Sequence, residues 1–343
     1  MDIVILLSIT LLIYLLPQNK EYLCVKSTSG LRGFLALGII FHHLSPWVTT
    51  GSEFSNFSYM GAYIVSIFFF FSAYGLYNQN ENKKNYLDKF LVTRLSKILL
   101  PFFAVSLIYL LYRFVDGQLL DLNFFISLFK NGSTIIFNGW FVNVIILLYI
   151  FFYTSFNFLQ NKLLSIILNS ILIIFYICLA IKMGYGFWWY NSTLAFILGL
   201  IWAKYQDVID KVLDRYYFVV LFSVAVLLFV SHHYGNLLSY LHIEDSYSYA
   251  LAANINNIIF TIYFVVSFLK KINFSNVFLI LLGGIAFELY MIHGLVISML
   301  GKIFVSSPVN DVLLTIFTLI ISISLAWIVN KLVNTITTKV NLL

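Results

Sequence analysis

Eleven apolar segments follow one another along this chain, and each is close to the length that a lipid bilayer demands of a helix. The 343 residues are 61% hydrophobic and 10% charged, whereas a soluble domain carries about 25% charged residues. We therefore predict an all-α, polytopic transmembrane helix bundle of about eleven helices. The segments are residues 2–17, 31–48, 59–78, 97–116, 140–157, 163–183, 188–205, 215–232, 249–270, 277–300 and 310–333.

The basic residues fall in alternate loops, which fixes an orientation. By the positive-inside rule these loops are cytoplasmic, so we expect the N-terminus outside and the C-terminus inside. The stretch from Asp2 to Leu16 has no basic start and no small-residue cleavage site, which favours a short first membrane helix over a cleaved signal peptide. The basic residues in question are Lys20, Lys26, Lys83, Lys84, Lys89, Arg94, Lys97, Lys204, Lys211, Arg215, Lys270, Lys271, Lys331 and Lys339.

The net charge of +6 is carried mainly by these loops. It therefore indicates membrane lipids as neighbours and predicts no nucleic-acid partner. Cys24 and Cys178 are the only cysteines, which excludes a disulfide framework in practice. An outer loop gathers three histidines with Glu244 and Asp245, but their spacing matches no familiar ligand motif, and no metal is expected.

Arg32, His42 and His43 lie in the second segment, where ionisable groups cost about 2.5–3.5 kcal/mol on insertion scales and rarely persist without a role. Arg32 and His43 are eleven residues apart, which is about 1100° of rotation and about 16 Å of rise in a helix. They therefore share one face, with the arginine at a membrane surface and the imidazole deeper. An imidazole can take and return a proton near neutral pH. The plain alternative is an interfacial arginine and a histidine that bonds a neighbouring helix, a role that we expect of His42.

Arg94 and Lys97 are three residues apart at the start of the fourth segment, so they project from one helix face. Such a pair can hold phosphate groups. Charge alone favours the simpler role of anchoring the helix on the cytoplasmic side. Pro101 is expected in the first turns of the helix, where a missing N–H costs little.

Tyr290 and His293 share a face of the tenth segment, and His293 is expected at a depth similar to that of His43. Two histidines at one depth on different helices could flank one cavity. Glu288 must be neutral, paired or facing water, either as part of the site or in a structural ion pair. Trp140 begins the fifth segment, where it suits either a stacking sugar or the aromatic belt of the interface.

Five blocks, in this order, resemble membrane acyltransferase family 3. The likeness covers residues 30 to about 335, and one block departs mildly because Ala73 stands where the family usually has glycine. The blocks are Arg32-Gly33-x-x-Ala36-Leu37 with His43, Phe68-Phe69-x-x-Ser72-Ala73, Arg94-x-x-Lys97 before Pro101, Trp140-Phe141, and Tyr290-Met291-Ile292-His293.

The resemblance implies ten core helices, so this chain is expected to add one. Residues 1–29 would form an extra N-terminal membrane helix with a short basic loop, and residues 30–343 the acyltransferase transmembrane domain. Some members carry a soluble esterase-like domain after the bundle. This chain stops at Leu343, which favours a one-domain enzyme that acylates a glycan or a lipid-linked sugar.

The resemblance further implies an O-acyltransferase with acetyl-CoA or another acyl-CoA as donor. The CoA phosphates would bind Arg94 and Lys97, and the pantetheine arm would pass Arg32 and bring the thioester to His43. There His43 would act as general base or as a transient acyl carrier. Tyr290, His293, Trp140 and Glu288 would lie on the side of the acceptor, which would be a surface polysaccharide or its lipid-linked precursor.

Two other functions are compatible with a polytopic bundle that contains histidines. A transporter or exporter of a glycan or its lipid-linked precursor would favour paired helix interruptions in corresponding halves, and the four prolines show no such symmetry. A glycan polymerase would favour a large outer loop, and the outer loops here are modest. The abundance of Ile, Phe, Asn and Lys suggests an AT-rich bacterial genome, so the expected location is the bacterial cytoplasmic membrane.

Overall fold

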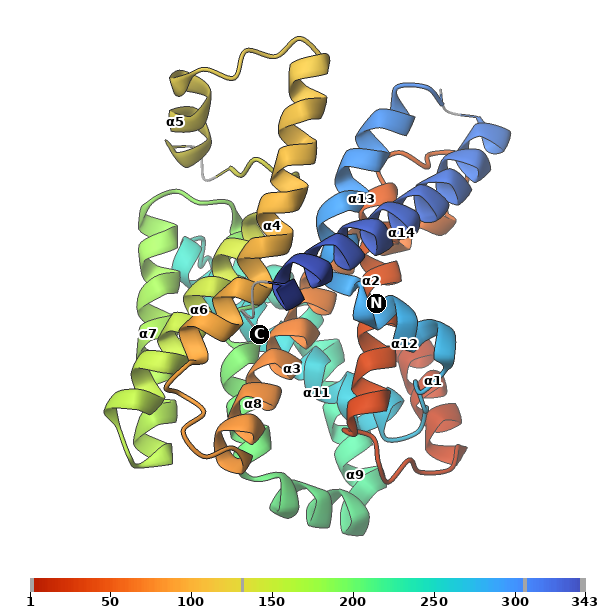
Figure 1. Cartoon of the computed structure of the whole chain (residues 1–343). Helices are drawn as coiled ribbons and strands as arrows, with labels where there is room; N and C mark the ends of the chain where they lie inside the picture. Colours follow the sequence, from red (N-terminus) through yellow and green to blue (C-terminus); the bar gives the residue numbers. More distant parts are fainter. Residues whose placement is uncertain (1–2, 131–132, 305–306, 340–343) are drawn as a thin grey trace. The chain divides into compact units, whose positions relative to one another are not determined.

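The computed structural model describes residues 3–130, 133–304 and 307–339, and within these ranges the chain forms helices and loops without a strand. The α-helices are α1 (Ile3–Leu15), α2 (Val25–Leu44), α3 (Gly61–Asn82), α4 (Phe90–Val115), α5 (Leu122–Lys130), α6 (Trp140–Phe158), α7 (Lys162–Lys182), α8 (Ala195–Lys204), α9 (Gln206–His232), α10 (Tyr234–Tyr240), α11 (Ser246–Phe264), α12 (Val277–Gly284), α13 (Ala286–Gly301) and α14 (Pro308–Lys339) (Figure 1). Short 3₁₀ turns cover Glu53–Tyr59 and Phe187–Trp189, and a π-helical turn, η3, covers Val265–Leu269.

Every predicted apolar segment contains a helix, and the all-α polytopic fold is confirmed. Among the described residues, seven helices are long and apolar enough to cross a membrane by themselves: α3, α4, α6, α7, α9, α11 with η3, and α14. The tenth predicted segment forms two helices, α12 and α13, with a bend of 76° at a short break between them. If this bent pair is counted as one span, the described residues contain up to eight spans. Helices α1 and α8 are shorter, and α2 is less apolar because it carries Lys26, Arg32 and two histidines.

The expectation for Pro101 was wrong. Helix α4 begins at Phe90, so Pro101 is buried in the helix interior and not in its first turns. A proline there removes the hydrogen bond that its N–H would donate four residues back, to the carbonyl of Lys97. The apolar pattern hid the true start because the first turns of α4 carry Thr93, Arg94 and Ser96.

The chain divides into two compact units. Unit 1 comprises Met1–Thr28, Ala62–Asp88 and Phe151–Ser275, and unit 2 comprises Ser29–Gly61, Lys89–Ile150 and Asn276–Leu343. The predicted boundary at residue 30 between an extra helix and a family core stays a prediction.

In unit 1, α1 and α11 both pack against α9. A buried lysine joins the end of η3 to α9, because Lys270 Nζ lies 3.2 Å from Asp210 Oδ1 and 3.7 Å from Asp214 Oδ1. Tyr22 donates a hydrogen bond to the same Asp210 carboxylate at 2.8 Å. The buried ammonium of Lys270 is thus paired with carboxylates, as a charge inside a protein must be.

In unit 2, α4, α13 and α14 pack against one another. Helix α2 approaches α12 so closely that only glycine fits on both sides of the contact. A Cβ at Gly33 would overlap the carbonyl oxygen of Leu279, and a Cβ at Gly283 would overlap that of Ser29. This small-residue crossing holds the first part of α2, with Arg32, against the segment that precedes α13.

Candidate functional site

Helix α2 runs without a break from Val25 to Leu44, so Arg32 and His43 lie on one stripe of a continuous helix. Arg32 is exposed near the N-terminal end, and His43 is half-buried in the last turn. The separation of about 16 Å that the sequence predicts therefore holds along the helix axis.

His43 meets His293 of α13 directly. The Nδ1 atom of His43 lies 2.7 Å from Nε2 of His293, and the two rings stack with centroids 4.8 Å apart. His293 is fully buried. The two histidines that the sequence predicts at one depth are thus hydrogen-bonded partners.

The hydrogen bonds around His293 determine which nitrogen of each neutral ring carries the proton. Nδ1 of His293 lies 3.0 Å from the carbonyl oxygen of Leu289, which can only accept, so Nδ1 carries the proton. A neutral imidazole has one donor and one acceptor, and Nε2 of His293 is therefore an acceptor. His43 must then donate from Nδ1, which leaves the lone pair on His43 Nε2 as the basic atom of the pair.

The neighbouring histidine, His42, makes a structural contact. Its Nδ1 lies 3.0 Å from the carbonyl oxygen of Phe57 in the loop that follows α2, so that nitrogen donates to the backbone. The ring packs against Gly61, where a Cβ would overlap it. His42 thus ties α2 to the loop, while His43 turns to α13.

Tyr290 joins the start of α6 to α13. Its hydroxyl donates to the carbonyl oxygen of Asn138 at 2.5 Å, and its ring packs on Phe141 and His293 with centroids 5.1 Å and 5.9 Å apart. Asn138 has a φ of +61° and turns the chain into α6, which begins with Trp140. The structure therefore brings Tyr290, His293 and the Trp140 turn together.

Glu288 faces a different neighbour. It is buried and its Oε1 accepts a hydrogen bond from the side-chain amide of Asn330 in α14, at 2.9 Å. Five residues separate Glu288 from His293, which is about 140° round a helix. The structure therefore places the Glu288 carboxylate on another side of α13 from the histidine pair, with an amide as its partner.

Arg94 and Lys97 lie in the first turns of α4, with Arg94 half-buried and Lys97 exposed. Further along the same helix, Tyr109 donates a hydrogen bond to the carbonyl oxygen of Met291 at 3.0 Å, close to His293 in α13. Arg94 precedes Tyr109 by fifteen residues, which is about 22 Å of helix. The basic pair and the histidine pair are thus well separated along α4 and α13, with the basic pair at one end of the helix.

Sequence reasoning missed Tyr109. Its side chain is fully buried, and its ring meets Phe137 edge-on with centroids 5.2 Å apart. Gly294, directly after His293, allows this approach, since a Cβ there would lie 3.2 Å from Phe137 Cβ and 3.3 Å from the Tyr109 hydroxyl. The signal was present, because Ser106, Tyr109 and Arg113 recur at helical spacing in an otherwise apolar span.

Two histidines of unit 1 have other partners. His232 Nδ1 lies 2.9 Å from the Tyr63 hydroxyl, and His233 Nδ1 lies 2.9 Å from the Phe229 carbonyl. Among the described residues, no group of three or more His, Cys, Asp or Glu side chains could hold a metal ion.

A protein-family model described as an acyltransferase domain matches residues 26–331, which is well over half of the chain. Comparison with curated proteins and with solved structures gives no significant match. The matched range contains α2, α4, α6 and α13, the helices that carry the residues described above.

Proposed function

Since the chain belongs to membrane acyltransferase family 3, we propose that it moves an acyl group, with acetyl as the expected chain, from cytoplasmic acyl-CoA to a hydroxyl group of a surface glycan or lipid-linked sugar. The observation that carries the proposal is the hydrogen bond between His43 and His293, which leaves a lone pair on His43 Nε2.

In the proposed reaction His43 Nε2 takes the proton of the acceptor hydroxyl while the oxygen of that hydroxyl attacks the thioester carbonyl. The carbon–sulfur bond then breaks, and the CoA thiolate takes the proton back from His43, which gives an ester and free CoA. General-base help of this kind is worth about 10²–10⁴ in rate. His293 stabilises the transient imidazolium because its Nε2 accepts from His43 Nδ1 throughout.

The alternative that His43 carries the acyl group itself uses the same nitrogen. Nε2 would attack the thioester, and the acceptor oxygen would then displace the imidazole. The two routes differ in one observable, because only the second forms an acyl-histidine that rapid acid quenching and mass spectrometry can detect.

Arg94 and Lys97 are proposed to bind the CoA phosphates at the cytoplasmic end of α4. A clamp there fits a donor that is loaded from the cytoplasm and carries its thioester on a long flexible arm. The rise of about 22 Å along α4 from Arg94 to Tyr109, near the histidine pair, supports separate places for the phosphates and the thioester. Arg32 would meet the arm on its way to His43. Tyr290 and Trp140 would line the acceptor side.

The chain is a multi-pass membrane protein. We propose the bacterial cytoplasmic membrane, with the N-terminus outside and the C-terminus in the cytoplasm, on the loop charges alone. The alternative of a glycan exporter has no support from the family match.

The test uses a strain that lacks the gene. NMR of its purified envelope glycans should lack O-acyl signals that the wild-type gene restores. His43→Ala should fail to restore them although the variant reaches the membrane in equal amount. Full restoration by His43→Ala would contradict the proposal, and unchanged glycans in the deletion strain would contradict the choice of acceptor.

A further inference from the structure

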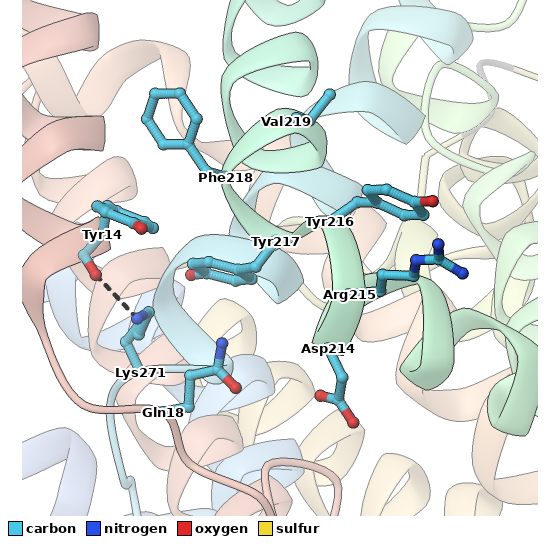
Figure 2. Close-up of a pocket in the computed structure, with 9 residues that line it drawn as sticks. All are labelled: Tyr14, Gln18, Asp214, Arg215, Tyr216, Tyr217, Phe218, Val219 and Lys271. Atoms are coloured by element: carbon cyan, nitrogen blue, oxygen red, sulfur yellow. Dashed lines mark hydrogen bonds between the residues drawn. The ribbon is translucent and has the colours of Figure 1, made fainter.

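An open groove in unit 1 lies where three elements end or bend together. Tyr14 lies in the last turn of α1 and Gln18 in the loop that follows, and Lys271 is the second residue after η3. Helix α9 changes direction at Tyr216, whose φ of −125° and ψ of 30° are not helical. The groove has a volume of about 430 Å³. Figure 2 shows the side chains that line it.

Lys271 forms one side of the groove. Its ammonium donates to the carbonyl oxygens of Tyr14 and Leu16 at 3.0 Å and 2.6 Å, and it lies 4.5 Å from the centre of the Tyr217 ring. An ammonium has three donors, and these carbonyls use two of them. Burial lowers the pKa of Lys271. An anion bound beside the ammonium would have the opposite effect and favour its charged form.

Arg215 forms the opposite side. Its guanidinium carbon lies 5.0 Å from the centre of the Tyr216 ring, and the side chain is exposed. Asp214 also lines the groove, but its carboxylate lies 3.7 Å from the buried ammonium of Lys270. Lys270 is shared with the closer Asp210, so Asp214 keeps part of its negative charge. The groove still has an excess of positive charge, because Arg215 and Lys271 are two cations against one carboxylate in its lining.

Beyond the bend, α9 presents an apolar surface that continues the groove. Phe218, Val219 and Phe222 are 42%, 60% and 41% exposed. Tyr14 and Tyr217 stack with centroids 6.2 Å apart, and Phe218 meets Tyr14 edge-on. Tyrosines between a charged and an apolar surface are typical of the boundary between lipid headgroups and acyl chains.

We propose that this groove, which Arg215 and Lys271 line, binds the headgroup of an anionic phospholipid, with the acyl chains along Phe218, Val219 and Phe222. On the orientation that the loop charges predict, the lipid belongs to the cytoplasmic leaflet, whose anionic lipids attract basic residues near the surface. A free phosphate or a nucleotide would use the two cations but would leave the apolar surface beyond the bend without a role.

The proposal is tested by native mass spectrometry of the purified full-length protein, titrated with phosphatidylglycerol or phosphatidylcholine. The wild type should retain phosphatidylglycerol in preference to phosphatidylcholine. Arg215→Gln should weaken phosphatidylglycerol binding about fivefold, as expected for one lost cation near a membrane surface. Lys271→Gln should do the same while its amide can still donate to the carbonyl oxygens of Tyr14 and Leu16.

Lys211→Gln is the matched control, because it removes a cation one turn earlier on α9 and does not line the groove. Equal weakening by Lys211→Gln would overturn the site and leave only general attraction. Equal affinity for the two lipids would overturn the anionic headgroup. Complete displacement of the lipid by millimolar inorganic phosphate would overturn the role of the acyl chains.

Discussion

Two histidines, one in each unit, show how the direction of a hydrogen-bond chain decides what a histidine can do. In unit 1 the side-chain amide of Asn256 donates to the Tyr63 hydroxyl oxygen at 2.8 Å. Tyr63 is then left to donate to Nδ1 of His232 at 2.9 Å, so a neutral His232 carries its proton on Nε2. In unit 2 the hydrogen bonds point the other way, because His43 is the donor to its partner, and a neutral His43 carries its proton on Nδ1.

Position in a membrane helix is therefore not enough to make a histidine a base. His232 and His43 both lie in the last turns of apolar helices, next to a second histidine. Of the two, only His43 has its Nε2 held without a proton. The reason is that its partner, His293, donates its own proton to the Leu289 carbonyl and must accept from His43 Nδ1. We therefore expect changes at His43 and at His232 to differ sharply in their effect on catalysis.

The largest effect is expected at His43 itself. In membranes supplied with radiolabelled acetyl-CoA, His43→Gln should lower the rate of acyl transfer to the endogenous acceptor by about 10²–10⁴-fold, because the base is lost. His232→Gln should stay within about threefold of the wild type, since His232 takes no part in the proposed proton transfer. Similar losses in both variants would remove the distinction between the two histidines.

A smaller loss is expected at His293, which positions His43. His293→Ala removes the acceptor for His43 Nδ1–H and should lower the rate by about 10–100-fold, less than the loss of the base itself. His293→Gln should recover part of the rate, because its amide oxygen can accept that hydrogen bond. A merely structural role would predict no such recovery at equal protein levels.

The basic pair should affect donor binding and not the chemical step. Removing a charge that pairs with phosphate costs about 1.5–3 kcal/mol, so Arg94→Gln should raise KM for acyl-CoA by at least about tenfold with little change in kcat. Lys83→Gln, in the loop after α3, is the control for plain positive charge on that side. If Lys83→Gln raised KM as much, Arg94 would be an anchoring residue.

The smallest effect concerns stability. Tyr290→Phe loses the hydrogen bond to the Asn138 carbonyl and should lower the free energy of unfolding by about 1 kcal/mol. Titration of the micelle-bound protein with a denaturing detergent measures this change. Tyr240→Phe is the control, because Tyr240 is 82% exposed, and it should leave the unfolding midpoint unchanged.

Much of the fold followed from local properties of the sequence. Apolar runs of bilayer length predict membrane helices, and the spacing of Arg32 and His43 predicts a shared face wherever the helix is continuous. The break between α12 and α13 was not predicted, because Gly283 and Gly284 can also pack inside a straight membrane helix. Gly283 is needed because α2 approaches it too closely for a Cβ. Such a contact between distant segments leaves no local pattern in the sequence.

The site was predicted in part for the same reason. The residue types and depths of His43, Tyr290 and His293 can be read from single helices. That His43 donates to His293, and that Glu288 turns to Asn330 instead, depends on how three helices rotate against one another. The tautomer depends further on a backbone carbonyl, that of Leu289, which no side-chain pattern records.

The most direct test of the account is the ¹⁵N NMR spectrum of histidine-labelled protein in micelles at about pH 8, where an ordinary histidine is neutral. Spectra of His43→Gln and His232→Gln assign the two rings by the loss of their signals. His43 should be protonated on Nδ1 and unprotonated on Nε2, and His232 should show the opposite tautomer. A proton on Nε2 of His43 would contradict its assignment as the base.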